Sequence, residues 1–449
     1  MIINLPADVN YIINRLQEAG YEAYAVGGCV RDSLLGREPS DWDITTSAKP
    51  DEIKALFKPT IDTGIQHGTV TVLRHNRGYE VTTYRIDGEY KDNRHPEEVT
   101  FTTSLREDLR RRDFTINAMA YNDNGLVDEF DGIGDIDRKI IRCVGDPDER
   151  FGEDALRMMR AVRFSAQLGY MIHEDTRKSV GRLHANLESV SAERINVELT
   201  KMLMSDHPEY IRDCYELGIT SVVLSELDEC MGFAQNNPHH CYDVGEHIIQ
   251  SLIYSRPDRV LRYALLFHDL GKPECATTDE NGVDHFHGHG DRSAEIACDI
   301  MHRLKFDNDT IHKVEVLVRY HDWDIEPDKR SVRRALNKLG TELFLLLLEV
   351  KQADVAAQSD YKKEEKLERL EQLRSLYDEI IADSECIQIK DLAINGGDLI
   401  AMGMQQGPEL GQTLNKLLDM VLDDPAMNTR SILMSRAYEI YTDENVTDR

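Results

Sequence analysis

The sequence predicts an α+β fold in which a small mixed α/β segment precedes a long helical one. Strand patterns alternate with short helical patterns up to about residue 137. Beyond that point strand signals fade and helical periodicity dominates, with breaks near residues 236–238, 277–291 and 395–397. Strands followed by a run of helices are typical of an α+β protein or of separate domains.

Composition limits the classes of protein to consider. A chain of 449 residues should form about two to four domains, and it is 41% hydrophobic and 30% charged, as a globular protein is. No apolar run is long enough to cross a bilayer, and the N-terminus lacks the features of a signal peptide. The eight cysteines form no CxxC pair. We therefore expect reduced thiols and a cytoplasmic location.

The net charge of -29 argues against a protein that simply coats nucleic acid. A nucleic-acid partner would need local basic surfaces on this acidic chain. Three stretches could provide them: residues 109–113, 156–164 and 331–340.

The first segment has a definite order of expected elements. Its first helix is amphipathic, with four apolar side chains pointing inward at Val9, Ile12, Ile13 and Leu16. The expected elements that follow are a strand ending at Gly27-Gly28, a short helix, a strand at 41–47, a helix at 48–57 with Pro50 near its start, and strands Thr69–Arg74 and Tyr79–Arg85 joined by a turn at 76–78.

Two aspartates on alternate positions, Asp41 and Asp43, indicate a metal site. In a strand they would share one face and repel each other unless a cation lay between them. Hard divalent cations take oxygen ligands and usually arrive with substrate phosphates. The preceding turn at Gly27-Gly28 leaves backbone N–H groups open to a triphosphate, and Arg31 adds a phosphate donor.

Glu80, in the neighbouring expected strand, is a candidate third carboxylate. Two cations about 3.5–4 Å apart could activate an attacking hydroxyl and stabilise a leaving pyrophosphate. The alternative is a loop of solvated aspartates. The glycine turn before the pair and the acidic strand after it favour the metal site.

Three segments carry a family resemblance. "GGCVRD…DWDI" resembles the signature of DNA polymerase beta-like nucleotidyltransferases. "EDLRRRDFTINAMAY" and "GDPDERFGEDALRMMRAVRFSAQLGY" are similar to class II tRNA nucleotidyltransferases, the CCA-adding enzymes, and to bacterial poly(A) polymerases. The resemblance spans essentially the whole chain. It implies Mg²⁺-dependent, untemplated transfer of CMP and AMP from CTP and ATP to the tRNA 3′ end.

The resemblance also implies roles for individual residues. Asp41, Asp43 and Glu80 are the implied catalytic carboxylates, the first two as metal ligands. The implied nucleotide-binding residues are Gly27, Gly28, Arg31 and Asp32 for phosphates, Arg112, Asp113 and Asn117 for the ribose, and Glu153, Asp154, Arg157, Arg160 and Arg163 for the base and triphosphate.

The last of these segments is expected to form one helix over residues 152–164, with Leu156, Met159 and Val162 on one side. An ordinary surface helix with ion pairs is the alternative. Asp154 and Arg157 would lie one turn apart on it. A carboxylate accepts and a guanidinium donates, which complements the Watson–Crick edges of both C and A and opposes those of U and G.

Residues 83–101, with a charged and glycine-containing middle, are expected to form a mobile surface loop. In the family such a loop resembles the one needed for the final AMP step. Its presence disfavours an enzyme that adds only CC. It does not separate a full CCA enzyme from an A-adding enzyme or a poly(A) polymerase.

A second constellation lies downstream. His247, the pair His268-Asp269, His289, His321 and Asp354 occur in an order that resembles the HD phosphohydrolase superfamily. Imidazoles favour transition metals and carboxylates also suit Mg or Mn, so the metal is left open. Buried structural histidines are the alternative. His285 and His287 compete with His289 for the ligand role.

The sequence thus predicts a nucleotidyltransferase head at 1–140, a helical neck at 141–230, an HD domain at 231–375, and a helical tail at 376–449 with possible tRNA contact. The expected partners are tRNA, ATP and CTP, with no membrane. Three other readings stay open: a poly(A) polymerase or A-adding enzyme, an HD phosphohydrolase with a nucleotide-sensing head, and a silent RNA-binding protein.

Overall fold

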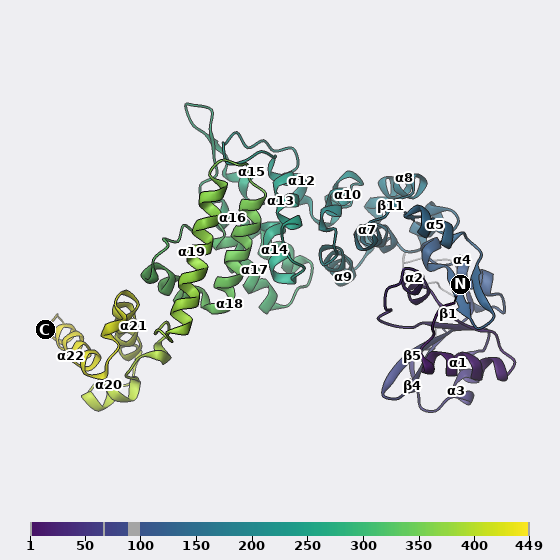
Figure 1. Ribbon diagram of the computed structural model, residues 1–449, viewed down its shortest axis with the longest axis horizontal. Coiled ribbons are helices and arrows are strands. Elements are labelled where there is room, and N and C mark those ends of the chain that lie inside the picture. The colour runs from purple at the N-terminus through teal and green to yellow at the C-terminus, as the bar shows by residue number, and fades with distance from the viewer. Residues whose placement is uncertain (1, 66–67, 89–98, 448–449) are drawn as a thin grey trace. The chain divides into compact units, whose positions relative to one another are not determined.

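The computed structural model describes residues 2–65, 68–88 and 99–447 (Figure 1). The chain forms two compact units. The first contains residues 1–228 with 303–305, and the second contains residues 229–302 with 306–449. Across the described ranges, no helix has both the length and the apolar character needed to span a membrane. The predicted α+β class is confirmed, while the finer division into four domains stays a prediction.

The first unit is built on a seven-stranded sheet in the order β3-β4-β5-β2-β1-β8-β9. Its strands are β1 Ala23–Val26, β2 Ile44–Thr46, β3 Thr60–Gly64, β4 Thr69–Arg74, β5 Arg77–Thr83, β8 Met119–Asn122 and β9 Gly125–Asp128. A separate pair joins β6 Arg85–Asp87 to β7 Val99–Phe101. Within the large sheet β2 and β5 run parallel, with Ile44 opposite Val81, so the residue just before β2 lies beside Glu80 of β5.

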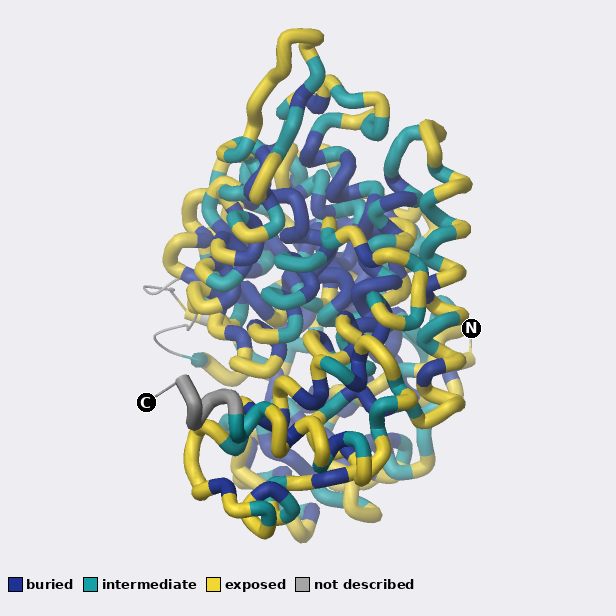
Figure 2. Tube along the Cα trace, turned by 90° about the vertical axis from the view of Figure 1, so that its left-hand side faces the viewer, coloured by how far each residue is buried: buried dark blue, intermediate teal, exposed yellow. Residues whose placement is uncertain are grey.

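Short helices accompany this sheet. They are α1 Ala7–Glu18, α2 Gly28–Leu34, α3 Pro50–Leu56, α4 Leu105–Arg110 and α5 Gly132–Arg138. The apolar face expected for α1 is confirmed, because Val9, Ile12, Ile13 and Leu16 are all buried in the core of this unit. Figure 2 shows the same division of exposed and buried positions along individual helices, which is the property that periodicity in the sequence reports.

Two expected boundaries in the sheet were wrong. β2 begins at Ile44, so Asp41 and Asp43 lie in the segment that leads into it. The β4–β5 turn consists of His75 and Asn76, both with positive φ (46° and 62°), and not of residues 76–78. Two such residues make the tight hairpin turn whose twist matches the flanking strands, and Asn tolerates that conformation.

The neck is helical, as expected. Its helices are α6 Pro147–Glu153, α7 Leu156–Leu168, α8 Glu174–Leu183, α9 Ala192–Leu203, α10 Ile211–Glu216, α11 Thr220–Val223 and α12 Ser225–Asp228, with a short pair β10 Ile140–Ile141 and β11 Met171–Ile172. The helix expected over residues 152–164 is interrupted at Asp154, which has extended backbone (φ -146°, ψ 104°). Its Oδ1 accepts a hydrogen bond from the Leu156 N–H at 3.1 Å. Aspartate competes in this way with the helical backbone and favours helix starts.

The second unit is almost entirely helical. Its helices are α13 Val244–Ile253, α14 Arg259–Phe267, α15 Lys272–Cys275, α16 His289–Arg303, α17 Asn308–Tyr320, α18 Lys329–Ala356, α19 Lys363–Ala382, α20 Gly396–Met402, α21 Pro408–Asp423 and α22 Arg430–Thr447. The break at 277–291 contains a small pair, β12 Thr277–Thr278 and β13 Asp284–His285. α13, α14, α17 and α18 pack together, while residues of α20, α21 and α22 share a core of their own.

Candidate active sites

The glycine turn between β1 and α2 is shaped by a close approach of Arg112. Gly27 has a φ of 84°, a conformation that favours glycine. A Cβ at this position would lie 2.8 Å from Nη1 of Arg112. The positive φ therefore favours glycine here, and a side chain at this position would press against the guanidinium. The Nε atom of Arg112 is buried and has no hydrogen-bond partner among the described residues.

The sheet brings Asp41, Asp43 and Glu80 to one place. The Val26 N–H donates to the carbonyl of Asp43 at 3.0 Å, which fixes the approach to β2. Because Ile44 pairs with Val81, Asp43 lies beside Glu80. Desolvation raises the pKa of the Asp43 carboxyl, Arg112 opposes this, and the negative charges of Asp41 and Glu80 raise it further.

These three carboxylates do not form a closed cage. Within the described part of the chain, the groups whose ligand atoms all lie within 4.8 Å of one another are in the second unit. Asp41, Asp43 and Glu80 are instead exposed. An open, mutually repelling set of carboxylates suits a divalent cation that arrives with substrate phosphates.

A single chain of side-chain contacts joins three of the sequence motifs. Arg31 donates to Asp32 at 2.9 Å and to Oδ1 of Asn117 at 2.6 Å. Asn117 donates to Oδ1 of Asp113 at 3.1 Å, and Arg160 donates twice to Oδ2 of Asp113, at 2.6 and 2.9 Å. Burial alone would raise the pKa of Asp113, but Arg160 and Arg157 outweigh it and hold that pKa well below its usual range.

Phe164 and Glu198 belong to this network and were missed. Three guanidinium groups lie near the Phe164 ring, those of Arg31 at 4.9 Å, Arg160 at 5.3 Å and Arg163 at 3.8 Å from its centre. Arg163 also pairs with buried Glu198 at 2.6 Å. Burial lowers the pKa of Arg163 to about 10, against the opposing charge of Glu198. In the sequence Phe164 reads as an ordinary core position of a helix, so no signal marked it.

Asp154 and Arg157 are not partners of each other. Oδ2 of Asp154 accepts from Arg194 of α9 at 2.7 Å. Arg157 donates to Glu153 at 2.5 Å and to the backbone carbonyls of Arg150 and Arg111, each at 3.2 Å. Each side chain is thus hydrogen-bonded to a partner of its own. No sequence pattern marked Arg194, which lies 40 residues downstream of Asp154.

The expected mobile loop falls largely outside the described residues, which omit 89–98. The described residues on either side of it form the β6–β7 pair.

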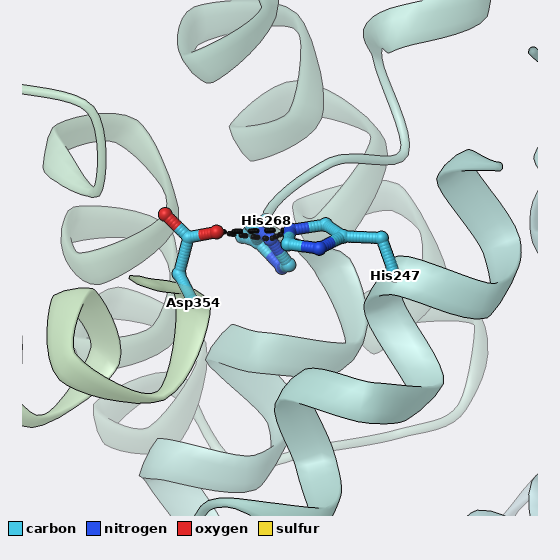
Figure 3. A group of neighbouring side chains, drawn as sticks. All are labelled: His247, His268 and Asp354. Atoms are coloured by element: carbon cyan, nitrogen blue, oxygen red, sulfur yellow. Dashed lines mark hydrogen bonds and ion pairs between the residues drawn. The ribbon is translucent and has the colours of Figure 1, made fainter. Parts of the chain in front are cut away.

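The second unit holds a compact group of three buried or half-buried ligands, His247 and His268 with Asp354 (Figure 3). The Nε2 atoms of the two histidines are 3.4 Å apart. Oδ1 of Asp354 lies 2.9 Å from Nε2 of His247 and 3.9 Å from Nε2 of His268. The side chains come from α13, the end of α14 and α18, and all three point toward one another.

A second group, Asp269 with His289 and His321, adjoins the first. Nε2 of His289 lies 3.0 Å from Nε2 of His321, and these atoms lie 3.4 and 3.6 Å from Oδ1 of Asp269. The other oxygen of Asp269 lies 3.3 Å from His268 and 3.5 Å from His247, so this carboxylate faces both groups. Burial by itself would raise the pKa of Asp269, but His268 and Lys272 hold it well below the usual value.

The ring orientation of three histidines suits metal binding. Nδ1 of His268, His289 and His321 each lies 2.7 Å from the backbone carbonyl three residues earlier. A carbonyl cannot donate, so Nδ1 carries the proton and Nε2 presents its lone pair. Metal-binding histidines are commonly held in this way. Oδ2 of Asp269 pairs with Lys272 at 2.7 Å, while Oδ1 is buried and faces the His289 and His321 rings. Together the six residues could hold divalent metal.

The competing histidines lie outside both groups. His285 contacts Asp279 at 3.3 Å, and its ring stacks on His287 with centres 5.6 Å apart. All three of His285, His287 and His289 line a cavity of about 290 Å³ that opens onto Asp269, His321 and Asp354.

Comparison with protein families divides the chain in the same order. Residues 23–142 match the poly A polymerase head domain. Residues 169–231 match the probable RNA and SrmB-binding site of polymerase A. Residues 291–437 match the putative tRNA nucleotidyltransferase domain 2.

Similar proteins cover the full length. The CCA-adding enzyme of Leuconostoc mesenteroides is 36% identical over 98% of this chain and 97% of its own. That of Levilactobacillus brevis is also 36% identical, over 94% and 95%. The crystal structure of the Bacillus stearothermophilus CCA-adding enzyme with CTP matches 97% of both chains at 30% identity, with a TM-score of 0.70. The Thermotoga maritima enzyme complexed with tRNA shares the fold, with 19% identity and a TM-score of 0.62.

Proposed function

The chain belongs to the CCA-adding enzyme family, and on that premise we propose that it adds CMP and AMP from CTP and ATP to the 3′ end of tRNA, to build or repair CCA without a template. The observation that carries this proposal is the continuous network from Arg31 through Asn117 and Asp113 to Arg160. It unites, around the glycine turn, the phosphate, ribose and base motifs that were quoted separately from the sequence.

The proposed roles follow from position. Gly27 and Gly28 let a triphosphate approach the backbone, and Arg31 faces its oxygens. Arg112, pressed against Gly27 and facing the charge of Asp43, would contact the ribose and the α-phosphate. Asp41 and Asp43, with Glu80 as the third carboxylate, would hold Mg²⁺. The bound cation would neutralise the triphosphate and lower the pKa of the attacking 3′-hydroxyl.

Base selection is proposed to rest on Asp154 and Arg157. A carboxylate oxygen accepts from the exocyclic amine of C or A, and a guanidinium donates to the adjacent ring nitrogen. In the structure Arg194 donates to Asp154, and Arg157 donates to Glu153. We propose that this support fixes their orientation before a nucleotide enters.

The proposal is tested with tRNA transcripts that end before CCA, with CTP and ATP supplied singly and together. A CCA-adding enzyme extends by CC with CTP alone and completes CCA with both. A poly(A) polymerase would add runs of A, and an A-adding enzyme would act only on transcripts ending in CC. Absence of incorporation under every condition would contradict the proposed transferase.

We further propose a metal-dependent phosphohydrolase at the two His/Asp groups. The observation that favours it is the set of three histidines whose Nδ1 atoms are engaged by carbonyls while their Nε2 atoms converge on Asp269 or Asp354. His247, His268 and Asp354 would hold one ion, and Asp269, His289 and His321 would hold a second. The expected metal is either a divalent transition ion or one of Mg²⁺ and Mn²⁺. When bound, it would polarise a phosphoester and lower the pKa of a water molecule.

This second activity is tested on RNA with 2′,3′-cyclic phosphate ends, with Mg²⁺, Mn²⁺, Ni²⁺ or Co²⁺ added to chelator-treated protein. Metal-dependent opening of the cyclic phosphate supports it. Inactivity with all four ions would assign the groups a structural role. The remaining proposals are a cytoplasmic location and the four-part division at residues 140, 230 and 375.

A further inference from the structure

A second cavity, of about 220 Å³, opens beside the two His/Asp groups, and none of the functions proposed above uses it. It shares His321, Asp322, Asp354 and Gln358 with the cavity described earlier, so the two meet at the proposed metal ligands. The first cavity is lined mostly by polar groups such as Asn237 and Lys272. The second is mixed in character, and that difference suggests which part of a substrate each could take.

The wall of the second cavity combines an aromatic ring, aliphatic side chains, cations and the carboxylates of Asp322 and Asp324. α19 contributes Lys366, Arg369, Leu370 and Leu373 from one face, at the spacing of successive helical turns. Trp323, half-buried, forms another part of the wall and packs on Tyr320 with ring centres 5.5 Å apart. Such a wall suits a planar organic ring better than a bare phosphate.

Lys351 is the cation best placed for a ligand. It lies on α18 one turn before Asp354, and among the described residues it makes no hydrogen bond or ion pair. Burial lowers the pKa of its ammonium, against the opposing charges of Asp322, Asp354 and Asp324. A shielded ammonium without a partner is costly and is stabilised by an anion.

The other two cations of the wall are already engaged. Arg369 binds Asp324 at 2.8 Å and the Ile325 carbonyl at 3.0 Å, both through one terminal nitrogen. Lys366 binds Gln358 and lies 3.1 Å from Nδ1 of His239. They shape the cavity, whereas no described side chain or carbonyl is bonded to the ammonium of Lys351.

We propose that this cavity holds the nucleoside of a phosphoester whose phosphate lies at His321 and Asp354, with the base against Trp323 and the phosphate charge met by Lys351. The inference rests on the proposed phosphohydrolase function and gives it a substrate class: a nucleoside phosphate, free or at the end of an RNA. Stacking on an aromatic side chain is worth about 1–3 kcal/mol per base.

The chain offers a direct binding signal, because it has only two tryptophans, Trp42 and Trp323. In a Trp42→Phe background, Trp323 is the sole indole fluorophore and reports on this cavity alone. Titration of that protein with 3′-AMP, with Mg²⁺ present, should quench the emission saturably. Ribose 5-phosphate, which has no base, should bind at least about ten-fold more weakly, the equivalent of one stacking contact.

Matched variants separate the cavity from its surroundings. Lys351→Gln should weaken 3′-AMP binding about ten-fold or more, because an ionic hydrogen bond contributes on the order of one such factor. Lys351→Arg keeps the charge and should retain most of the affinity. Such a result would show that the loss in Lys351→Gln comes from the missing charge and not from misfolding. Lys338→Gln is the control: its ammonium lies 5.2 Å from the Trp323 ring centre, but it does not line the cavity.

Hydrolysis of bis(p-nitrophenyl) phosphate, measured on the same wild-type protein, tests the phosphohydrolase independently. Saturable quenching that depends on Lys351 supports the nucleoside site even if nothing is hydrolysed, in which case only the proposed activity fails. Equal affinities for 3′-AMP and ribose 5-phosphate, or an unchanged affinity in Lys351→Gln, overturn the site even if hydrolysis occurs. A trinucleotide with a 3′-phosphate that saturates where 3′-AMP does not would identify an RNA end as the source of the ligand.

Discussion

At the scale of single residues, the proposed transferase depends on carboxylates that disfavour one another when no cation is present. Asp41 and Glu80 raise the pKa of Asp43 in addition to the effect of desolvation. All three are exposed, so little packing depends on them. Removing one of these carboxylates should therefore lower the activity without lowering the stability of the fold.

Asp41→Ala or Asp43→Ala should abolish incorporation from CTP and from ATP alike, by about three orders of magnitude or more, because a bound cation supplies several kcal/mol of charge stabilisation. The melting temperature should stay the same or rise, since repulsion is relieved. Rates with each nucleotide and thermal melts provide the measurement. Asp123→Ala, an exposed aspartate in the β8–β9 turn, is the control. Near-normal incorporation by both variants would rule out the metal role.

Asp154→Asn should weaken the preference for C and A over U and G. The amide keeps an oxygen to cap the Leu156 N–H but also presents a donor where the carboxylate only accepts. A buried mismatch costs about 1–3 kcal/mol, so discrimination should fall roughly ten- to hundred-fold. Incorporation of all four nucleotides is compared between wild type and variant.

Glu193→Gln, an exposed change beside Arg194, should leave the nucleotide preference intact. Reversing the charges of Asp154 and Arg157 is a poorer experiment, because Arg194 and Glu153 would then face like charges. If Asp154→Asn selects nucleotides as the wild type does, Asp154 does not read the base.

At the scale of elements, α4 is tied to β2 through one buried carboxylate. Asp108 is fully buried, and it accepts two hydrogen bonds from Arg111, at 2.7 and 2.9 Å, and one from Thr45 at 2.9 Å. Burial alone would raise the pKa of Asp108, but Arg111 and Arg112 outweigh it and lower that pKa. The link holds the helix that precedes Arg112 against the strand that follows Asp43.

Asp108→Asn should reduce the free energy of unfolding at neutral pH by about 3–5 kcal/mol, because it removes the charged member of a buried ion pair with Arg111. The folded pKa lies below the unfolded one, so the contribution of Asp108 is fully present above the unfolded value. It is lost as the pH falls through the folded value. Thermal melts of both proteins between pH 7 and 3 should therefore show that the difference in stability between wild type and variant becomes smaller as the pH falls. Glu107→Gln on the same helix is the control, and a constant difference across this range would contradict the linkage.

At the scale of the whole molecule, the two proposed sites lie in different compact units. The head and neck residues are in the unit of residues 1–228, and all six His/Asp ligands are in the other. Each site has its own set of acidic ligands. Loss of one should therefore leave the chemistry of the other in place.

The double variant His268→Ala with Asp269→Ala should lose metal-dependent hydrolysis of 2′,3′-cyclic phosphate ends. It should keep the rate of CCA addition within about two-fold of wild type, because substitutions at separate sites usually act independently. Asp354→Asn is a milder change that tests the same site if the double variant unfolds. His285→Ala, outside both ligand groups, should keep both activities. Parallel loss of both activities in stable Asp354→Asn protein would show that the sites are not independent.

The sequence by itself determined the fold class, the order of motifs and most local elements. An amphipathic period, a glycine turn and a proline at a helix start are properties of neighbouring residues, so contiguous sequence is enough to predict α1, the β1–α2 turn and α3. The predicted element boundaries were wrong where a side chain competes with the backbone, as at Asp154, and where two residues adopt positive φ, as at His75 and Asn76.

Only the tertiary structure decided which distant groups meet. The parallel pairing of β2 and β5 brings Glu80 beside Asp43, and the packing of α7 on α9 brings Arg194 to Asp154 and Glu198 to Arg163. Among three nearby histidines, the start of α16 selects His289 as the one that faces His321. Such contacts depend on strand register and helix packing, which are set by the sum of many weak burial energies and not by any short stretch of sequence.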